Sequence, residues 1–308
     1  MLTTPVKTRI LITLCSNITR GGLSFLTGLI VARSLGPKLY GDFFFLLGSF
    51  LAVMQLIELG TSHAFYTFLS NRPQGLRFLV SYILWQLFQF LFSLLLIGFL
   101  IPQEVLDQIW LGNEKRVILL SFMAVFMKVQ AWKTIVQLGE SNRLTLRVQI
   151  GEISIVTIHL LIIFVLWKMG FLSISLIFTL IIFEYLFAIF ITFNFVYVPH
   201  VDTGKWDGKE VLKKYYAFCL PLVLCSILGF LEAFSKTWML QNFGAAEQQA
   251  YYGVSYQFAT VSILLTSSIL NIFWKEIAEA HENGNLERIH YLYKKTSRFL
   301  FFSGVIIC

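Results

Sequence analysis

The chain has 308 residues, of which 57% are hydrophobic and only 13% are charged. This composition excludes an ordinary soluble domain, in which about a quarter of the residues are charged. The formal net charge of +7 does not call for nucleic acid as a partner. Most Lys and Arg residues lie between apolar stretches, where membrane orientation explains them.

Apolar stretches of membrane-spanning length recur along the whole chain and predict helices, because lipid leaves no water to satisfy the backbone. They are too long and too uniformly apolar to be strands of a membrane barrel. The fold class is therefore an all-α polytopic membrane protein. We expect eight spans and the start of a ninth, at residues 10–33, 42–66, 78–101, 117–138, 148–168, 171–197, 215–242, 251–274 and 299–308. Residues 275–298 are expected to form a helical segment on the inner membrane surface, broken at Asn283-Gly284-Asn285.

The Lys and Arg residues also predict the orientation of the spans. Connections on the side of the N-terminus hold about three times as many of them as connections on the opposite side, and positive charge marks the cytoplasmic side. We therefore expect the N-terminus in the cytoplasm and the protein in the cytoplasmic (inner) membrane. The four cysteines lie in apolar stretches without a C-x-x-C motif, so the sequence predicts no disulfide, metal or other cofactor.

The first span carries a charge, Arg20, near its middle. Such a charge costs roughly 2.5–3.5 kcal/mol on insertion scales, so we expect it to face a cavity or a partner. Gly36-Pro37 then ends this helix. Small and polar residues share one face of the same helix, at spacings of three and four residues: Asn17, Gly21, Ser24 and Gly28. A face of this kind favours close helix packing or a water-filled lumen.

A turn motif occurs twice, about six spans apart. Leu35-Gly36 followed by Tyr40-Gly41 recurs as Phe243-Gly244 followed by Tyr252-Gly253. An even number of spans between the copies gives both the same orientation, which predicts parallel repeats related by an axis along the membrane normal. We expect a two-lobe transporter fold with an N-terminal six-helix lobe (1–200), a cytoplasmic linker (201–214) and a partial C-terminal lobe (215–308). The chain then represents the N-terminal eight to nine spans of a twelve-span protein.

Ionisable residues occur within the spans more often than structural ion pairs alone require, which predicts a polar interior. Besides Arg20 they are Glu58, Lys128, Lys133, Glu152, His159, Glu184, Glu232 and Lys236.

Several of these residues have two readings. Glu232 and Lys236 form either a self-neutralised pair on one helix or part of a cavity. Arg20 faces a central cavity or pairs with Glu58, and His159 is a packing residue or a proton relay. Glu152 and Glu184 lie near or within the cytoplasmic halves of their spans. Each can pair with Arg143, with Arg147 or with the other, and the sequence does not choose among these partners.

The opening segment, SNITRGGLSFLTGLIVARSLGPKLYGDFFFLLGSF, resembles the N-terminus of polysaccharide-exporting flippases. These are the O-antigen-type members of the multidrug/oligosaccharidyl-lipid/polysaccharide exporter superfamily. The matching features are the Asn/Arg pair in the first span, VARSLGP leaving it and YGDF entering the second. The later FGAAEQQAYYGVSYQFATV resembles the equivalent turn of the second lobe.

This resemblance implies two six-helix lobes around a central cavity. It also implies translocation of an undecaprenyl-pyrophosphate-linked oligosaccharide to the outer leaflet by alternating access, for surface polysaccharide biosynthesis. Implied partners are this lipid-linked oligosaccharide, membrane lipids, and glycan polymerases and glycosyltransferases. Basic cavity residues would meet the anionic substrate, and Arg20 and Lys236 match that role by position. The predicted substrate-binding residues are Arg20, Asn17, Lys236 and Lys128, and the predicted coupling or ion-pair residues are Glu58 and Glu232.

Two rival functions are compatible with the composition. An ion-coupled multidrug or organic-cation antiporter of the same fold would use the acids of the spans, and the net charge of the cavity distinguishes it from a flippase. A membrane-embedded glycan polymerase or ligase would carry a large outer loop, whereas the predicted outer connections are short. No nucleotide-binding loop or nucleophile–base arrangement is visible, so we expect a transporter and not an enzyme.

Overall fold

The computed structural model describes residues 6–71, 75–197, 208–282 and 285–307, and within them every element is a helix. The elements are α1 (Val6–Glu58), α2 (Thr61–Asn71), α3 (Leu76–Leu95), η1 (Leu96–Leu100), α4 (Gln103–Ile109), α5 (Lys115–Val125), η2 (Phe126–Ala131), α6 (Trp132–Ser141), α7 (Thr145–Met169), α8 (Ile174–Val196), α9 (Gly208–Glu282) and α10 (Leu286–Ile307). The segments η1 and η2 are π-helical continuations of their neighbours.

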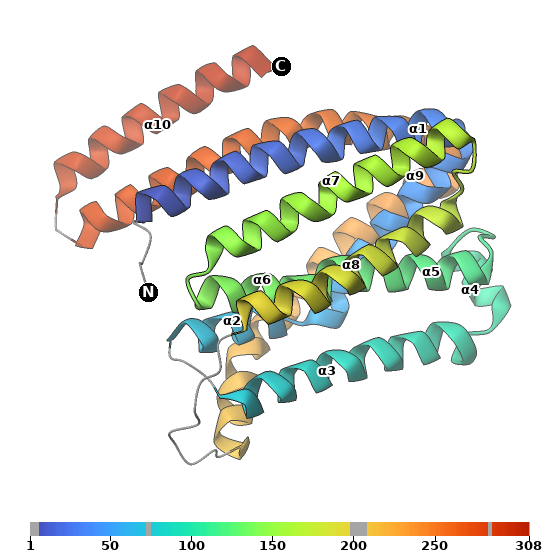
Figure 1. Ribbon diagram of the computed structural model, residues 1–308, viewed down its shortest axis with the longest axis horizontal. Helices are drawn as coiled ribbons and strands as arrows, with labels where there is room; N and C mark the ends of the chain where they lie inside the picture. The colour runs from blue at the N-terminus through green and yellow to red at the C-terminus, as the bar shows by residue number, and fades with distance from the viewer. Residues whose placement is uncertain (1–5, 72–74, 198–207, 283–284, 308) are drawn as a thin grey trace.

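The first two predicted spans are the two arms of α1, joined at a kink. Gly36 has φ 72° and ψ 172°, a conformation that is essentially confined to glycine, and Pro37 follows it. Figure 1 shows α1 turning back on itself at this point. The second arm is shorter than predicted, because Leu59 and Gly60 take positive φ and residues 61–66 belong to α2.

The seventh and eighth predicted spans are likewise the two arms of α9. The kink residue is Ala245, with φ 62° and ψ 173°, one residue later than the Gly244 that the turn motif indicates. Part of the predicted linker 201–214 is also helical, since α9 begins at Gly208; the positions before it lie outside the described residues.

Six helices of the described residues are long and apolar enough to cross a membrane, and two of them are the kinked pair. They are Ile12–Glu58, Leu76–Leu100, Lys115–Ser141, Thr145–Met169, Ile174–Val196 and Val211–Thr260. These helices coincide with the predicted spans to within a few residues at most ends. Large apolar side chains are exposed along α3, α7 and α8, as lipid contact requires. The protein is therefore a helical, membrane-embedded protein.

The C-terminal part differs from the prediction. We expected a span ending at 274, a surface helix over 275–298 and a new span from 299. Instead α9 continues to Glu282, and α10 runs without interruption from Leu286 to Ile307. The predicted break at 283–285 does separate the two helices, although residues 283 and 284 themselves lie outside the described residues. Asn285 caps α10 by accepting a hydrogen bond from the backbone N–H of Arg288, at 2.9 Å.

The kinked helices α1 and α9 pack against each other in antiparallel fashion along both arms. In Figure 1 they form two nested V shapes that turn back at the same end of the molecule. Glycines allow the close approach, because a Cβ on any of them would meet the opposite helix. The contacts run in opposite chain directions: Gly28–Gln257, Gly41–Ala246, Gly48–Thr237 and Gly60–Leu222.

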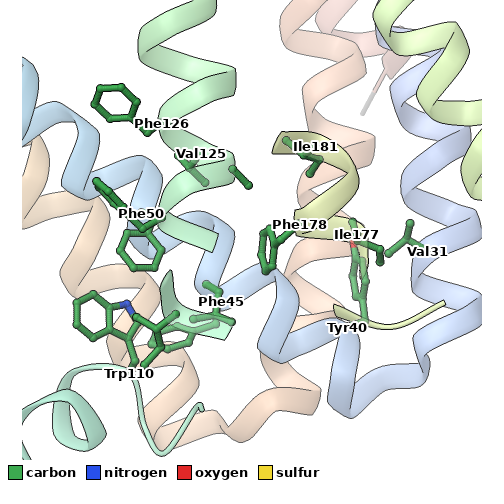
Figure 2. Close-up of a cluster of buried hydrophobic side chains, with 14 of the residues drawn as sticks. Val31, Tyr40, Phe45, Phe50, Trp110, Val125, Phe126, Ile177, Phe178 and Ile181 are labelled. Carbon is green, nitrogen blue, oxygen red and sulfur yellow. The ribbon is translucent and has the colours of Figure 1, made fainter. Parts of the chain in front are cut away.

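The main apolar core lies beneath the kinks, between α1, α5, α8 and the short helix α4. Trp110, from the predicted outer connection, is 4% exposed and stacks on Phe50 with ring centroids 5.2 Å apart. Its indole N–H donates to Ser49 Oγ at 3.2 Å. Figure 2 shows Trp110 and Phe50 together on one side of the cluster, Phe178 near its middle, and Tyr40 and Val31 on the other side. This packing holds the second arm of α1 against α5 and α8, and so fixes one wall of the cavity described next.

Candidate functional site

A cavity of about 480 Å³ lies between both arms of α1, the helices α7 and α8, the segment η2 and the second arm of α9. The small and polar face of the first span lines it, with Asn17, Arg20, Gly21, Ser24 and Gly28 all contributing. The predicted one-sided stripe therefore faces a cavity, and Arg20 is among its lining residues.

Arg20 is held by two neighbours. Its guanidinium forms a salt bridge with Glu152 of α7 and donates a hydrogen bond to Asn17 Oδ1, one turn earlier on α1. The side chains of Arg20 and Glu152 are 27% and 13% exposed. The Arg20 Nε is buried and has no hydrogen-bond partner among the described residues. The predicted pairing of Arg20 with Glu58 is wrong, because Glu152 is the carboxylate that contacts Arg20. The Nε–H of the guanidinium remains available to donate to a further acceptor.

Lys128 enters the cavity from the π-helical segment η2. A π turn shifts the register of the side chains that follow it, and such turns occur frequently at functional sites. Glu184, on α8, lines the same cavity. Lys133 follows this turn and contacts Glu58 in a different cluster.

His159 and Glu184 also line the cavity and contact each other. The His159 Nδ1 lies 2.7 Å from the Glu184 Oε2, joining α7 to α8. The other carboxylate oxygen, Oε1, is buried without a partner among the described residues. The sequence shows both residues inside spans, but it does not show that they pair, because they come from different helices.

Two predicted site residues lie outside the cavity, on the first arm of α9. Lys236 and Glu232 are 51% and 68% exposed, and the Nζ and Oε1 atoms are 3.1 Å apart. The two residues form the self-neutralised i, i+4 pair that was one of the two predicted arrangements. Neither side chain is among the lining residues of this cavity, so the cavity does not support the predicted substrate-binding role of Lys236.

Glu58 belongs to a separate polar cluster at the end of α1. Its Oε1 lies 2.9 Å from Lys133 Nζ and accepts a hydrogen bond from Ser62 of α2. Nearby, Tyr215 of α9 donates its hydroxyl to the Thr61 carbonyl. These bonds tie the end of α1 to α6 and the start of α2 to α9, so Glu58 has a structural position and does not line the cavity.

At the kink end of the cavity the lining is aromatic, and sequence analysis missed it. We call Tyr40, Phe44, Tyr256 and Gln257 the aromatic end, and Arg20, Lys128, His159 and Glu184 the charged end. The Gln257 amide N–H donates to the Tyr40 hydroxyl at 2.6 Å, across the α1–α9 contact. Tyr40 belongs to the repeated turn motif, which was the one available signal; nothing in the sequence distinguishes Gln257.

The site contains two cations and two carboxylates. Arg20, Lys128 and Glu184 line the cavity, and Glu152 contacts Arg20 from outside the lining. Positive charge at this depth is costly unless an anion compensates it. Glu152 compensates Arg20, so an anionic ligand that binds Arg20 would share it with this carboxylate or displace the carboxylate.

Among the residues that the structure describes, no group of three His, Cys, Asp or Glu side chains has the arrangement of a metal site. Comparison of the chain with protein-family models, curated proteins and solved structures found no match.

Proposed function

We propose that this protein is a membrane flippase that moves an undecaprenyl-pyrophosphate-linked oligosaccharide across the cytoplasmic membrane for surface polysaccharide biosynthesis. The observation that carries the proposal is the cavity with Arg20 and Lys128 in its wall, enclosed by helices of membrane-spanning length. A pyrophosphate diester is an anion that accepts several hydrogen bonds, and it matches a guanidinium and an ammonium group.

The unpartnered Arg20 Nε supports this assignment. A planar guanidinium binds phosphate oxygens through parallel N–H donors, and one such donor is free of protein partners among the described residues. A phosphate oxygen would satisfy it, which removes the cost of a buried donor without a partner. Lysine at this position would supply charge without the fork geometry.

Two features support alternating access by two lobes, and the distribution of Lys and Arg supports an N-terminus in the cytoplasm. The kinks of α1 and α9 share nearly the same backbone angles, at Gly36 and Ala245, as repeated units would. The two helices also meet along one antiparallel seam, where one lobe would rock against the other. Glycan polymerases and glycosyltransferases of the same membrane are the proposed partners.

The proposal is tested in proteoliposomes that contain a fluorescent undecaprenyl-pyrophosphate saccharide, by quenching the label in the outer leaflet with a membrane-impermeant reductant. We expect Arg20→Ala to slow translocation by about tenfold or more, since one charge-assisted bond is lost. Arg20→Lys should be impaired less. Arg33→Ala is the matched control, because Arg33 is exposed near the kink and does not line the cavity. Full translocation by Arg20→Ala would remove the proposed role of the cavity.

One observation favours a second candidate, an organic-cation antiporter. The cavity holds the Glu184 carboxylate and several aromatic rings, which together attract cations. The same liposomes distinguish the two functions. Uptake of ethidium driven by a proton gradient, abolished by Glu184→Gln and unaffected by Arg20→Ala, would favour the antiporter and contradict the flippase.

A further inference from the structure

We propose that the aromatic end of the cavity is the subsite for the sugar directly attached to the pyrophosphate. This inference rests on the proposed function and assigns the two ends of one cavity to two parts of one substrate. The charged end takes the pyrophosphate, and Tyr256 and Gln257 take the sugar.

The first observation is an unused acceptor on Gln257. Its amide nitrogen is bound to the Tyr40 hydroxyl at 2.6 Å, which fixes the orientation of the amide. Its Oε1 is buried and has no hydrogen-bond partner among the described residues. Buried acceptors of this kind are nearly always satisfied. The Oε1 lies against Gly28, and both Gly28 and Gln257 line the cavity, so the cavity is the nearest space from which a donor could approach. A sugar hydroxyl or the N–H of an acetamido group is such a donor.

The second observation is a set of aromatic rings beside this amide. Phe44 lies between Tyr40 and Tyr256, with centroid distances of 6.3 Å to each. Tyr40 is 2% exposed and supports the set, whereas Tyr256 is 47% exposed and lines the cavity. The faces of aromatic rings are electronegative, so they attract the polarised C–H groups of a pyranose ring. An open ring next to an oriented amide is a suitable surface for one sugar.

The third observation is the spacing between the two ends. Gly28 contacts the Gln257 amide, because a Cβ at Gly28 would clash with it. Gly28 therefore marks the aromatic end on α1, and it follows Arg20 by eight residues on a regular stretch of this helix. A rise of 1.5 Å per residue separates the two positions by about 12 Å. A pyrophosphate and one pyranose ring joined in line span a similar length.

The test uses two pyrophosphate diesters of equal charge, geranyl methyl diphosphate and geranyl-diphospho-N-acetylglucosamine, with the purified full chain in detergent. The ratio of their Kd values measures the contribution of the sugar. For the unaltered protein we expect the sugar probe to bind about tenfold more tightly. Tyr256→Leu and Gln257→Leu should bring the ratio close to one, while the Kd of the methyl ester changes little.

Two further variants separate this role from general effects. Arg20→Ala should weaken both probes by similar factors and leave the ratio intact. Tyr251→Leu, on the same helix and 60% exposed, should behave like the unaltered protein. Because Tyr256 is half exposed, its variant remains informative if Gln257→Leu fails to fold.

The outcomes are distinct. Equal binding of both probes by the unaltered protein overturns the sugar subsite and leaves the proposed function standing. An unchanged ratio in both variants overturns the assignment to Tyr256 and Gln257. Failure of both probes to bind contradicts the proposed function, and with it this inference.

Discussion

At the scale of single residues, carboxylates from neighbouring helices contact two of the basic side chains of the cavity. Glu152 forms a salt bridge with Arg20, and Glu184 contacts His159. Burying an arginine without a partner would be strongly unfavourable, so these pairs make the empty cavity tolerable. The same pairs compete with any anionic ligand, because a bound anion must share or displace the carboxylate.

This competition predicts the effect of Glu152→Gln. The amide keeps the size of the side chain but removes the charge that neutralises Arg20, so binding of geranyl methyl diphosphate should tighten by about tenfold. Equilibrium binding in detergent measures the change. Glu104→Gln, on the exposed side of α4, is the control that removes a carboxylate outside the cavity. Weaker binding by Glu152→Gln would mean that this carboxylate holds Arg20 in its binding geometry instead of competing for it.

At the scale of elements, the kinks of α1 and α9 have nearly the same backbone dihedral angles although the kink residues differ. Gly36 adopts its angles without strain, whereas Ala245 has a Cβ in a region that is essentially restricted to glycine. The first arm of α1 and the second arm of α9 both depend on these angles to reach the cavity. The kinks therefore determine both the wall of the site and part of the stability of the fold.

Reciprocal substitutions test this point. Gly36→Ala should lower the stability by about 1–3 kcal/mol, and Ala245→Gly should stabilise the protein or leave it unchanged, since strain outweighs the added chain entropy. Thermal unfolding in detergent measures both. Gly22→Ala is the matched control, because a Cβ at either Gly22 or Gly36 meets no atom within 4 Å and only the backbone conformation differs. Equal effects at Gly22 and Gly36 would contradict the role of the dihedral angles.

At the scale of the whole molecule, the seam between α1 and α9 connects the N-terminal helices to the C-terminal part of the chain. It extends along both arms, with glycine-mediated contacts and cross-helix hydrogen bonds such as Gln241 Nε2 to Asp42 Oδ1 at 2.8 Å. If two lobes rock during transport, this seam is the surface that must open.

A reversible cross-link tests whether it opens. A Cβ at Gly48 would lie 3.9 Å from the Cβ of Thr237, which is within the range of a disulfide. In a protein whose native cysteines are replaced by Ser, we expect Gly48→Cys with Thr237→Cys to form this bond on oxidation. Translocation should then stop and recover after reduction, while the two single variants remain active under oxidation. Undiminished translocation by the fully cross-linked protein would show that the seam stays closed throughout the cycle.

Much of the helical layout was predictable from local sequence. The spans from residue 78 to 197 agree with the helices, and Gly36-Pro37 marks the first kink. The presence of Arg20 and Lys128 in a polar interior was also predictable, as both line the cavity. The predicted helix end at 66 was wrong, because α1 ends at Glu58 and α2 begins at Thr61, and α9 and α10 continue through residues 274 and 298. A helix boundary within continuous helix-compatible sequence is decided by packing and turns.

The sequence by itself determined that the chain is a set of membrane helices with buried charge, because lipid acts on each segment separately through its own apolar content. Only the tertiary structure decided which charges meet: Arg20 with Glu152, Glu58 with Lys133, and Lys236 with Glu232 outside the cavity. It also decided that Gln257 meets Tyr40. Such pairs depend on the rotation and crossing of helices that are distant in the chain, and no local pattern of residues encodes that geometry.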